Sequence, residues 1–185
     1  MLSLDVLSPN SNDKIALVIF GNVASGKSTF CKTILTMLPG YNYVCIDDIR
    51  KKWYHKHPEM EGFAREKKCE DECIDQILAS RLLVWETSAA SLLYKRMKLR
   101  VKVSFKTFYV YINCPRHECL HRFDRRKKAG HKLYLPNFRK KLSISELINH
   151  FHWIQVDLRR DLELDSDTLT PDEMVEAFLN YFKEK

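Results

Sequence analysis

Short apolar runs alternate along the chain with longer stretches in which apolar residues recur at helical spacing. The short runs are typical of strands buried on both faces, because they lack the polar positions of a half-exposed strand. These predicted strands span residues 15–20, 43–46, 82–85, 107–112 and 161–164. Helical spacing predicts helices over residues 28–38, 63–80, 143–158 and 171–182, and helices that begin near residues 88 and 115.

Two of the predicted helices carry recognisable start signals. Ser143 and Glu146 have the spacing of a capping box, in which two side chains satisfy backbone N–H groups at a helix start. Thr170 and Glu173 repeat that spacing, and Pro171 stands at the first helical position. Because strand and helix alternate throughout, we expect an α/β fold, with a five-stranded parallel sheet covered by helices on both faces. Ligands then gather at the carboxyl ends of the strands.

The segment "GNVASGKST" follows the first predicted strand directly. Gly21 and Gly26 allow the backbone to bend around an anion, and the helix that follows adds its positive end. In this pattern Lys27 reaches the outer phosphates and the hydroxyl of Ser28 ligates Mg²⁺. The alternative is a loop with a purely structural role. The predicted nucleotide-binding residues are Gly21, Asn22, Val23, Ala24, Ser25, Gly26, Lys27, Ser28 and Thr29.

A phosphate-binding loop alone does not define the reaction, because GTPases, mechanical ATPases and kinases share it. The guanine-reading motif Asn-Lys-x-Asp is absent. No apolar run ends in the Asp of a strong Walker B motif, and 185 residues are few for a motor domain. A small phosphotransferase is the interpretation that remains.

The second predicted strand leads straight into "IDDIRKKW". Asp47 or Asp48 would emerge at the carboxyl end of that strand, facing the phosphate site. Arg50 lies three residues after Asp47, so the two share one side of a helical turn. The carboxylate can accept the proton of an acceptor hydroxyl, and the arginine can hold an anionic group of the acceptor. Alternatively, the acid caps a helix and the arginine is an ordinary surface residue.

Together, "GNVASGKST" and "IDDIRKKW" resemble the small P-loop kinases around phage-type 5′-hydroxyl polynucleotide kinase, whose acceptor loop reads Asp-Asp-x-Arg. The resemblance implies a P-loop NTPase fold of the nucleoside-kinase-like kind, a three-layer sandwich with a helical lid. It also implies that Asp47 is the general base and joins Ser28 at the metal, and that Asp48 and Arg50 contact the acceptor. Zeta-toxin and antibiotic-phosphorylating kinases share this skeleton, so it predicts phosphoryl transfer better than it predicts the acceptor.

Two later segments extend the resemblance. The family has a strand that ends in Asp-Thr, and here Glu86 and Thr87 stand in that place, which implies a role toward the substrate. For Glu86, a helix cap or a surface acid is the alternative. The family's lid helix carries arginines on one face, and "RFDRR" supplies Arg122, Arg125 and Arg126 in a lid expected over residues of about 115–142. Planar guanidinium groups suit the charge of a transferring phosphoryl group, so we expect them at ATP, with Arg122 and Arg126 catalytic.

Composition changes this picture in a few respects. The chain has 31 Lys and Arg against 24 Asp and Glu, a net charge of +7, which favours polyanionic partners. The excess is concentrated in residues 95–106 and 121–132, where a solvated face is the alternative. We expect one domain over residues 1–185, with residues 1–12 a flexible start. No apolar run could span a membrane and no signal peptide is evident, so we expect a cytoplasmic protein.

Six scattered cysteines are expected to be thiols in a reducing compartment. The cluster Cys114, His117, Cys119 and His121 raises a zinc site as a minor alternative to a helix that carries these side chains. The histidine pairs at residues 55/57 and 150/152 are weaker candidates.

The sequence thus predicts a Mg²⁺-dependent kinase that transfers the γ-phosphoryl group of ATP, with GTP also compatible, to a hydroxyl group. The favoured acceptor is the 5′ end of a polynucleotide. A small-molecule kinase for a nucleotide sugar or an antibiotic is the first alternative. A nucleotide-dependent binding or switch protein with negligible turnover is the second. Protein partners cannot be inferred from the sequence.

Overall fold

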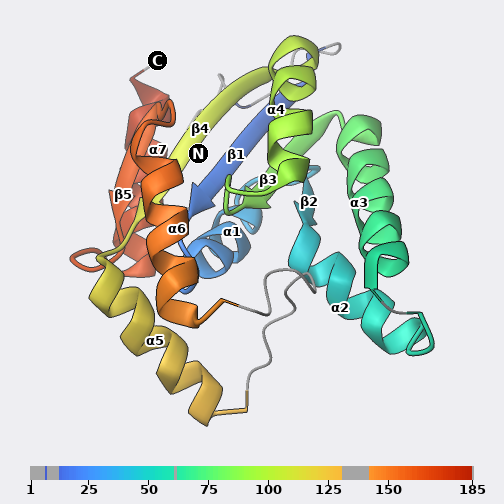
Figure 1. Ribbon diagram of the computed structural model, residues 1–185. Coiled ribbons are helices and arrows are strands. Elements are labelled where there is room, and N and C mark those ends of the chain that lie inside the picture. Colours follow the sequence, from blue (N-terminus) through green and yellow to red (C-terminus); the bar gives the residue numbers. More distant parts are fainter. Residues whose placement is uncertain (1–6, 8–12, 61, 131–141, 185) are drawn as a thin grey trace.

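The computed structural model describes residues 7, 13–60, 62–130 and 142–184, and Figure 1 shows their arrangement. Their core is a parallel sheet of five strands in the order β2-β3-β1-β4-β5. The fold class predicted from the sequence is therefore confirmed. The strands are β1 (Ile15–Gly21), β2 (Asn42–Cys45), β3 (Leu82–Thr87), β4 (Lys106–Asn113) and β5 (Leu162–Asp165).

Helices connect the strands and cover both faces of the sheet. They are α1 (Lys27–Leu35), α2 (Ile46–Lys56), α3 (Gly62–Ala79), α4 (Leu92–Ser104), α5 (Arg116–Lys128), α6 (Ile144–Val156) and α7 (Pro171–Lys183). Both predicted capping boxes are present, at the starts of α6 and α7. Each box satisfies backbone N–H groups that a helix start would otherwise leave without partners.

The three layers follow from alternation of side chains along the buried strands. In β1, Ile15, Leu17 and Ile19 pack toward α1 and α7, where Phe30 and Phe178 are fully buried. The intervening residues of β1 face the opposite cluster, which includes side chains of α2, α3 and α4. Because all seven residues of β1 are buried, this strand lies between two helical layers, as a central strand of a parallel sheet must.

The structure shifts several predicted boundaries. The predicted strand at 43–46 ends at Cys45, because the chain enters α2 at Ile46 without a loop. The predicted helix at 28–38 ends at Leu35. The helix expected from about residue 88 begins at Leu92, after Ala89 has adopted a left-handed φ of 55°. The result places α2, and the two acids in its first turn, directly at the carboxyl end of β2.

α2 lies to one side of the carboxyl ends of the strands, and α5 and α6 lie to the other (Figure 1). Of the predicted lid, α5 and the start of α6 are described, and residues 131–141 lie outside the described residues. Of the predicted flexible start, only Leu7 is described, and its side chain is buried against the α1–α7 side. Within the described residues, no helix is both long and apolar enough to span a bilayer.

Candidate active site

The loop between β1 and α1 has the geometry of a phosphate cradle. Ala24 and Gly26 have φ angles of 58° and 97°, and these left-handed residues turn the chain sharply before the helix. α1 starts with no side-chain cap and no acidic residue in its first turn, so its N-terminal N–H groups and positive end face the loop. This arrangement favours an anion at the start of α1.

Gly21 is required by close packing rather than by its dihedral angles. A Cβ atom built at this position would lie 2.4 Å from the carbonyl oxygen of Ile112 in β4 and 2.9 Å from Oγ of Ser25. Neither distance is compatible with a real contact, so only glycine lets β4 and the loop approach β1 this closely. The first glycine of the motif is therefore needed for the fold of the loop as well as for its bend.

α6 holds the loop from the other side. The buried side chain of Asn22 donates a hydrogen bond to the carbonyl oxygen of Ile148 in α6 at 2.9 Å, and it accepts one from the N–H of Val23 at 2.8 Å. Val23 packs against two small clusters that include Leu147 and Cys119. The loop is thus fixed to a helix more than a hundred residues away in the sequence.

Lys27 and Ser28 are the two loop residues for which the sequence predicts phosphate and metal contacts, and both are engaged within the site. The ammonium group of Lys27 donates to the carbonyl oxygen of Asn22 at 2.5 Å, which holds its charge over the loop. Oγ of Ser28 donates to Oε1 of Glu86 at 2.7 Å, and the hydroxyl of Tyr43 donates to the other carboxylate oxygen. Burial and the neighbouring Glu86 charge raise the pKa of Tyr43, so this phenol stays protonated and remains a donor.

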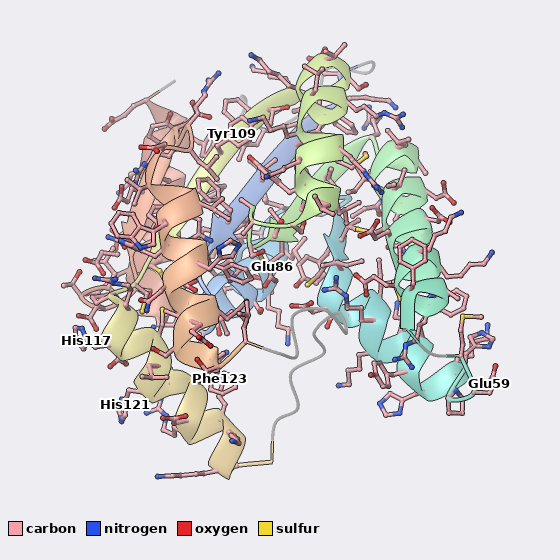
Figure 2. All side chains as sticks on the ribbon, viewed as in Figure 1. Glu59, Glu86, Tyr109, His117, His121 and Phe123 are labelled. Atoms are coloured by element: carbon pink, nitrogen blue, oxygen red, sulfur yellow. The ribbon has the colours of Figure 1, made fainter. Side chains whose placement is uncertain are left out.

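Glu86 is the site residue whose position most changes the interpretation of the sequence. Glu86 is 5% exposed and lies one residue before the end of β3, which pairs with β1 in parallel (Figure 2). The alternative of a surface acid is therefore wrong. An acid thus stands near the carboxyl end of an apolar strand next to the loop, where a Walker B motif has its Asp.

The donors at Ser28 and Glu86 fit Mg²⁺. Magnesium prefers hard oxygen ligands and is usually held by one or two carboxylates together with phosphate oxygens of the substrate. A hydroxyl and a carboxylate 2.7 Å apart, beside a phosphate loop, match that donor set. Asp47, which the resemblance also placed at the metal, has its carboxylate on Arg50 instead, and its side chain is 55% exposed.

The two acids at the start of α2 lie on different faces of the helix. Asp47 accepts a hydrogen bond from Nη1 of Arg50 at 2.8 Å. Nε of Arg50 donates to both carboxylate oxygens of Glu66 in α3, at 3.1 and 3.0 Å, and Nη2 also pairs with Glu66. Asp48 instead lines a groove on the outer side of α2, with Tyr43 among its neighbours. The predicted pair of Asp47 and Arg50 is present, and Glu66 joins it.

Arg50 is a buried clamp rather than a surface residue. It is 9% exposed, and its guanidinium lies between the carboxylates of Asp47 and Glu66. Burial alone would lower the pKa of this guanidinium, but the hydrogen bond to Glu66 and the charge of Asp47 outweigh burial and raise it. Each terminal nitrogen retains one further N–H for an acceptor group. The geometry therefore indicates that the first role of Arg50 is to hold the carboxylate of Asp47 in position.

The three predicted lid arginines separate into two kinds. Arg122 donates from Nε to Glu118 at 2.7 Å and from Nη2 to the carbonyl oxygen of Ser166 at 2.8 Å. Ser166 lies on the turn after β5, and its Cβ is 3.6 Å from the place a Cβ of Gly26 would take. Arg122 thus fastens α5 beside the phosphate loop. Arg125 and Arg126 lie exposed in the next turn of α5.

Thr87, the other predicted substrate residue, has a local role in the structure. Its Oγ1 accepts a hydrogen bond from the N–H of Ala89 at 3.0 Å, and the residue is 6% exposed. Thr29 is exposed in the first turn of α1 and accepts, through its carbonyl oxygen, a hydrogen bond from Thr33. The remaining loop residue, Ser25, is fully buried, and its Oγ has no hydrogen-bond partner among the described residues.

The cysteine–histidine cluster does not form a metal site within the described residues, where no group of three potential ligands converges. Cys114 and Cys119 are buried as thiols, whereas His121 is exposed, and Figure 2 shows His117 and His121 along the outer side of α5. A hydrogen bond with Cys119 lowers the pKa of Cys114 to about 7, although burial opposes the shift. The hydrogen bond with Cys114 in turn raises the pKa of Cys119.

Three site residues escaped the sequence analysis. Glu66 lies sixteen residues after Arg50 in "REKKCEDE", where nothing distinguishes it from the surrounding surface charges. Ser166 likewise has no motif. Tyr43 carried a usable signal, because it lies two residues before Cys45 on β2 and so shares a face with it, the face that meets Glu86.

Comparison with solved structures places this geometry in a known fold. A kinase structure from Chloroflexus aurantiacus, described there as putative, superposes with a TM-score of 0.63 at 12% identity, over 95% of this chain and 99% of that one. A gluconokinase from Sinorhizobium meliloti gives 0.57 at 20% identity, over 92% of each chain. A chain of the Pnkp1/Rnl/Hen1 RNA repair complex gives 0.61 at 16% identity, over 81% of this chain.

This chain spans only 48% of the RNA repair chain. No protein-family model matches the sequence, and no curated protein matches it either. At these identities the structural likeness shows the fold. The fold is that of these P-loop kinase structures, and the phosphate loop and the parallel sheet agree with it.

Proposed function

We propose that this protein is a Mg²⁺-dependent kinase that transfers the γ-phosphoryl group of ATP to a hydroxyl group, with the 5′-hydroxyl end of a polynucleotide as the acceptor. The observation that carries the proposal is the convergence at one edge of the sheet. There the phosphate loop, the Ser28–Glu86 pair and the Asp47–Arg50–Glu66 clamp follow β1, β3 and β2. A nucleotide-binding module without an acceptor would not need the clamp.

Each residue then has a defined task in an in-line transfer. The loop N–H groups and Lys27 hold the phosphates and balance the charge that develops on them. Ser28 and Glu86 hold Mg²⁺, which when bound neutralises phosphate charge. Asp47 accepts the proton of the acceptor hydroxyl, and Arg50 keeps that carboxylate in place. Arg122 holds α5 beside the phosphate loop, and Arg125 and Arg126, on the same helix, face the phosphates and exclude water, which would otherwise act as the acceptor.

The polynucleotide acceptor rests on the Asp-Asp-x-Arg segment, on the net charge of +7 and on the likeness to the RNA repair chain. One observation favours a second candidate, a small-molecule kinase. The gluconokinase aligns over 92% of its own length, whereas the RNA repair chain aligns over 48%. The fold therefore accommodates either acceptor, and the experiment must offer both.

The test is transfer of labelled γ-phosphate from ATP, with Mg²⁺, to an oligonucleotide with a 5′ hydroxyl. Nucleotides, nucleotide sugars and sugar acids are offered in parallel reactions. Lys27→Ala serves as the inactive control. We expect label on the oligonucleotide, and we expect Asp47→Ala to abolish transfer while ATP binding persists.

Label only on a small molecule would keep the mechanism and remove the polynucleotide acceptor. Undiminished transfer by Asp47→Ala would show that Asp47 is not the base. Binding of ATP without transfer to any acceptor would favour a nucleotide-gated binding protein.

A further inference from the structure

The outer face of α2 borders a groove that the mechanism above does not use. The groove has a volume of about 780 Å³. Residues of β2, at the edge of the sheet, and of α2 line it, together with one side chain of α3. We call it the α2 groove, and its lining residues are Tyr43, Cys45, Asp48, Ile49, Lys51, Lys52, His55, Lys56 and Gln76.

The charges of the groove follow one line along the helix. Asp48, Lys51, Lys52, His55 and Lys56 are spaced at i, i+3, i+4, i+7 and i+8, so they share one face of α2. The three lysines are exposed, and none forms an ion pair or a hydrogen bond within the described part of the chain. Asp48, at the start of α2, is the one carboxylate of the lining, and no ion pair joins it to these lysines. Three positive charges therefore face the groove against one negative charge.

The groove leads to the proposed transfer site. Tyr43 lines the groove, and its hydroxyl donates to Glu86, which in turn accepts a hydrogen bond from Ser28. Asp48 follows Asp47 directly in the first turn of α2. A molecule whose hydroxyl reaches Asp47 can therefore extend outward past Asp48 and along the lysines.

The length of the charged line suits a polymer. From Lys51 to Lys56 the helix rises about 7.5 Å, at about 1.5 Å per residue. One strand of a nucleic acid advances about 3.4 Å per nucleotide in a duplex, so this span matches about three consecutive phosphates. A small acceptor with a single anionic group would leave most of the line unused.

We propose that the α2 groove binds the phosphodiester backbone of the acceptor strand, downstream of the hydroxyl that receives the phosphoryl group. This assignment rests on the proposed kinase function and names the residues that select a polynucleotide over a mononucleotide. Lys51, Lys52 and Lys56 contact backbone phosphates. These contacts read charge and spacing and not base identity, so single-stranded DNA and RNA of one sequence both bind.

The test is a triple variant in which Lys51, Lys52 and Lys56 become Gln. These substitutions remove charge from exposed helix positions at little cost in helix propensity. The matched control is the triple Gln variant of Lys95, Lys98 and Lys102, which are exposed on α4. Each variant lowers the net charge from +7 by three, to +4. Only the first alters the groove.

Binding of an oligonucleotide with a 3′ fluorophore and a 5′ hydroxyl is measured against salt concentration. Three phosphate contacts to a single strand contribute about 2 to the slope of log affinity against log salt, at about 0.7 per contact. Between about 50 and about 200 mM salt, that slope corresponds to a roughly 20-fold loss of affinity. We expect the groove variant to lose this component and the α4 control to retain it.

Transfer kinetics separate the groove from the proposed function. With an oligonucleotide acceptor, we expect the groove variant to raise KM about tenfold or more at low salt, while kcat and the KM for ATP stay unchanged. With a nucleoside 3′-monophosphate, which has one phosphate, the two variants should match the unsubstituted protein.

If the control weakens binding as much as the groove variant does, net charge and not the groove binds the strand, and the proposal is overturned. Normal oligonucleotide kinetics in the groove variant overturn it as well, whereas the kinase function then stands. If no acceptor is phosphorylated but salt-dependent binding still requires the three lysines, the kinase proposal fails and the groove remains a nucleic-acid site. If the groove variant loses binding to anionic lipid vesicles but binds the oligonucleotide as the unsubstituted protein does, the polynucleotide assignment is overturned.

Discussion

The clamp of Arg50 between Asp47 and Glu66 makes a quantitative prediction for the substitution Glu66→Gln. The side chains of Arg50 and Glu66 are 10% and 15% exposed, so solvent screens this pair little. Glutamine keeps one acceptor oxygen but turns an NH₂ group toward the guanidinium. Removal of one partner of a fully buried pair costs about 3–5 kcal/mol. Here Asp47 still supplies a carboxylate at 2.8 Å, so we expect a loss of about 1.5–3 kcal/mol.

Thermal unfolding provides the assay. For a chain of this size, each kcal/mol shifts Tm by about 2–4 °C, so Glu66→Gln should lower Tm by about 3–12 °C. A matched control lies one helical turn away, where Glu70 accepts a hydrogen bond from Arg96 at 3.2 Å. Arg96 is 65% exposed, and exposed pairs contribute about 0–1 kcal/mol. Burial also raises the pKa of Glu70, which makes its charged form less favourable, so Glu70→Gln should leave Tm nearly unchanged.

Activity gives an independent readout of the same clamp. Arg50 without Glu66 no longer holds Asp47 in one position, and a displacement of about 1 Å can cost about a hundredfold in rate. We therefore expect kcat of Glu66→Gln to fall at a temperature where the protein is fully folded, with the KM for ATP unchanged. Equal Tm losses for Glu66→Gln and Glu70→Gln would refute the assignment of a buried clamp. A stability loss with unchanged kcat would refute the positioning role.

Three further predictions concern the loop and its surroundings. Glu86→Gln should raise the half-saturating Mg²⁺ concentration by about 10- to 100-fold, measured by metal titration of nucleotide binding, whereas Glu163→Gln on the sheet edge should not. Gly21→Ala should lower the free energy of unfolding in urea by roughly 3 kcal/mol, because the added Cβ would meet backbone atoms. Gly130→Ala places its Cβ in open space at a φ of 83° and should cost roughly 1–2 kcal/mol. Equal losses in the two variants would contradict the packing argument. Because the pKa of Cys114 is lowered to about 7, ionisation of this thiol stabilises the fold increasingly as pH rises from about 7 to 9, and this stabilisation is lost as pH falls through about 7. The difference in unfolding free energy between the unsubstituted protein and Cys114→Ser should therefore grow over that window. A constant difference would contradict the lowered pKa.

The fold was predictable because its signals are local. Apolar runs such as residues 15–20, with no polar interruption, mark strands that need cover on both faces. Side chains near in sequence mark helix starts, as Ser143 and Glu146 do. The errors fall at boundaries, where one residue decides the geometry. Ile46 is apolar enough for a strand, yet it opens α2 because the chain turns into the helix without a loop.

The candidate site was only partly predictable. The phosphate loop is contiguous, so its residues could be read directly, and Asp47 and Arg50 are close enough in sequence to share a helical turn. Glu86 was recognisable as a candidate, but its contact with Ser28 joins residues 58 positions apart. Whether such an acid reaches the loop depends on β3 lying next to β1, and no local sequence pattern predicts the order of the strands in the sheet.

By itself, the sequence determined the alternation of strands and helices, the phosphate loop and the residue types available for phosphoryl transfer. The tertiary structure decided which of them meet. It placed Glu66 against Arg50, Ser166 against Arg122, and Asp47 and Asp48 on different faces of one helix. The physical reason is that hydrophobic periodicity specifies what each segment buries, whereas the partner of a buried charge depends on how separate segments pack together.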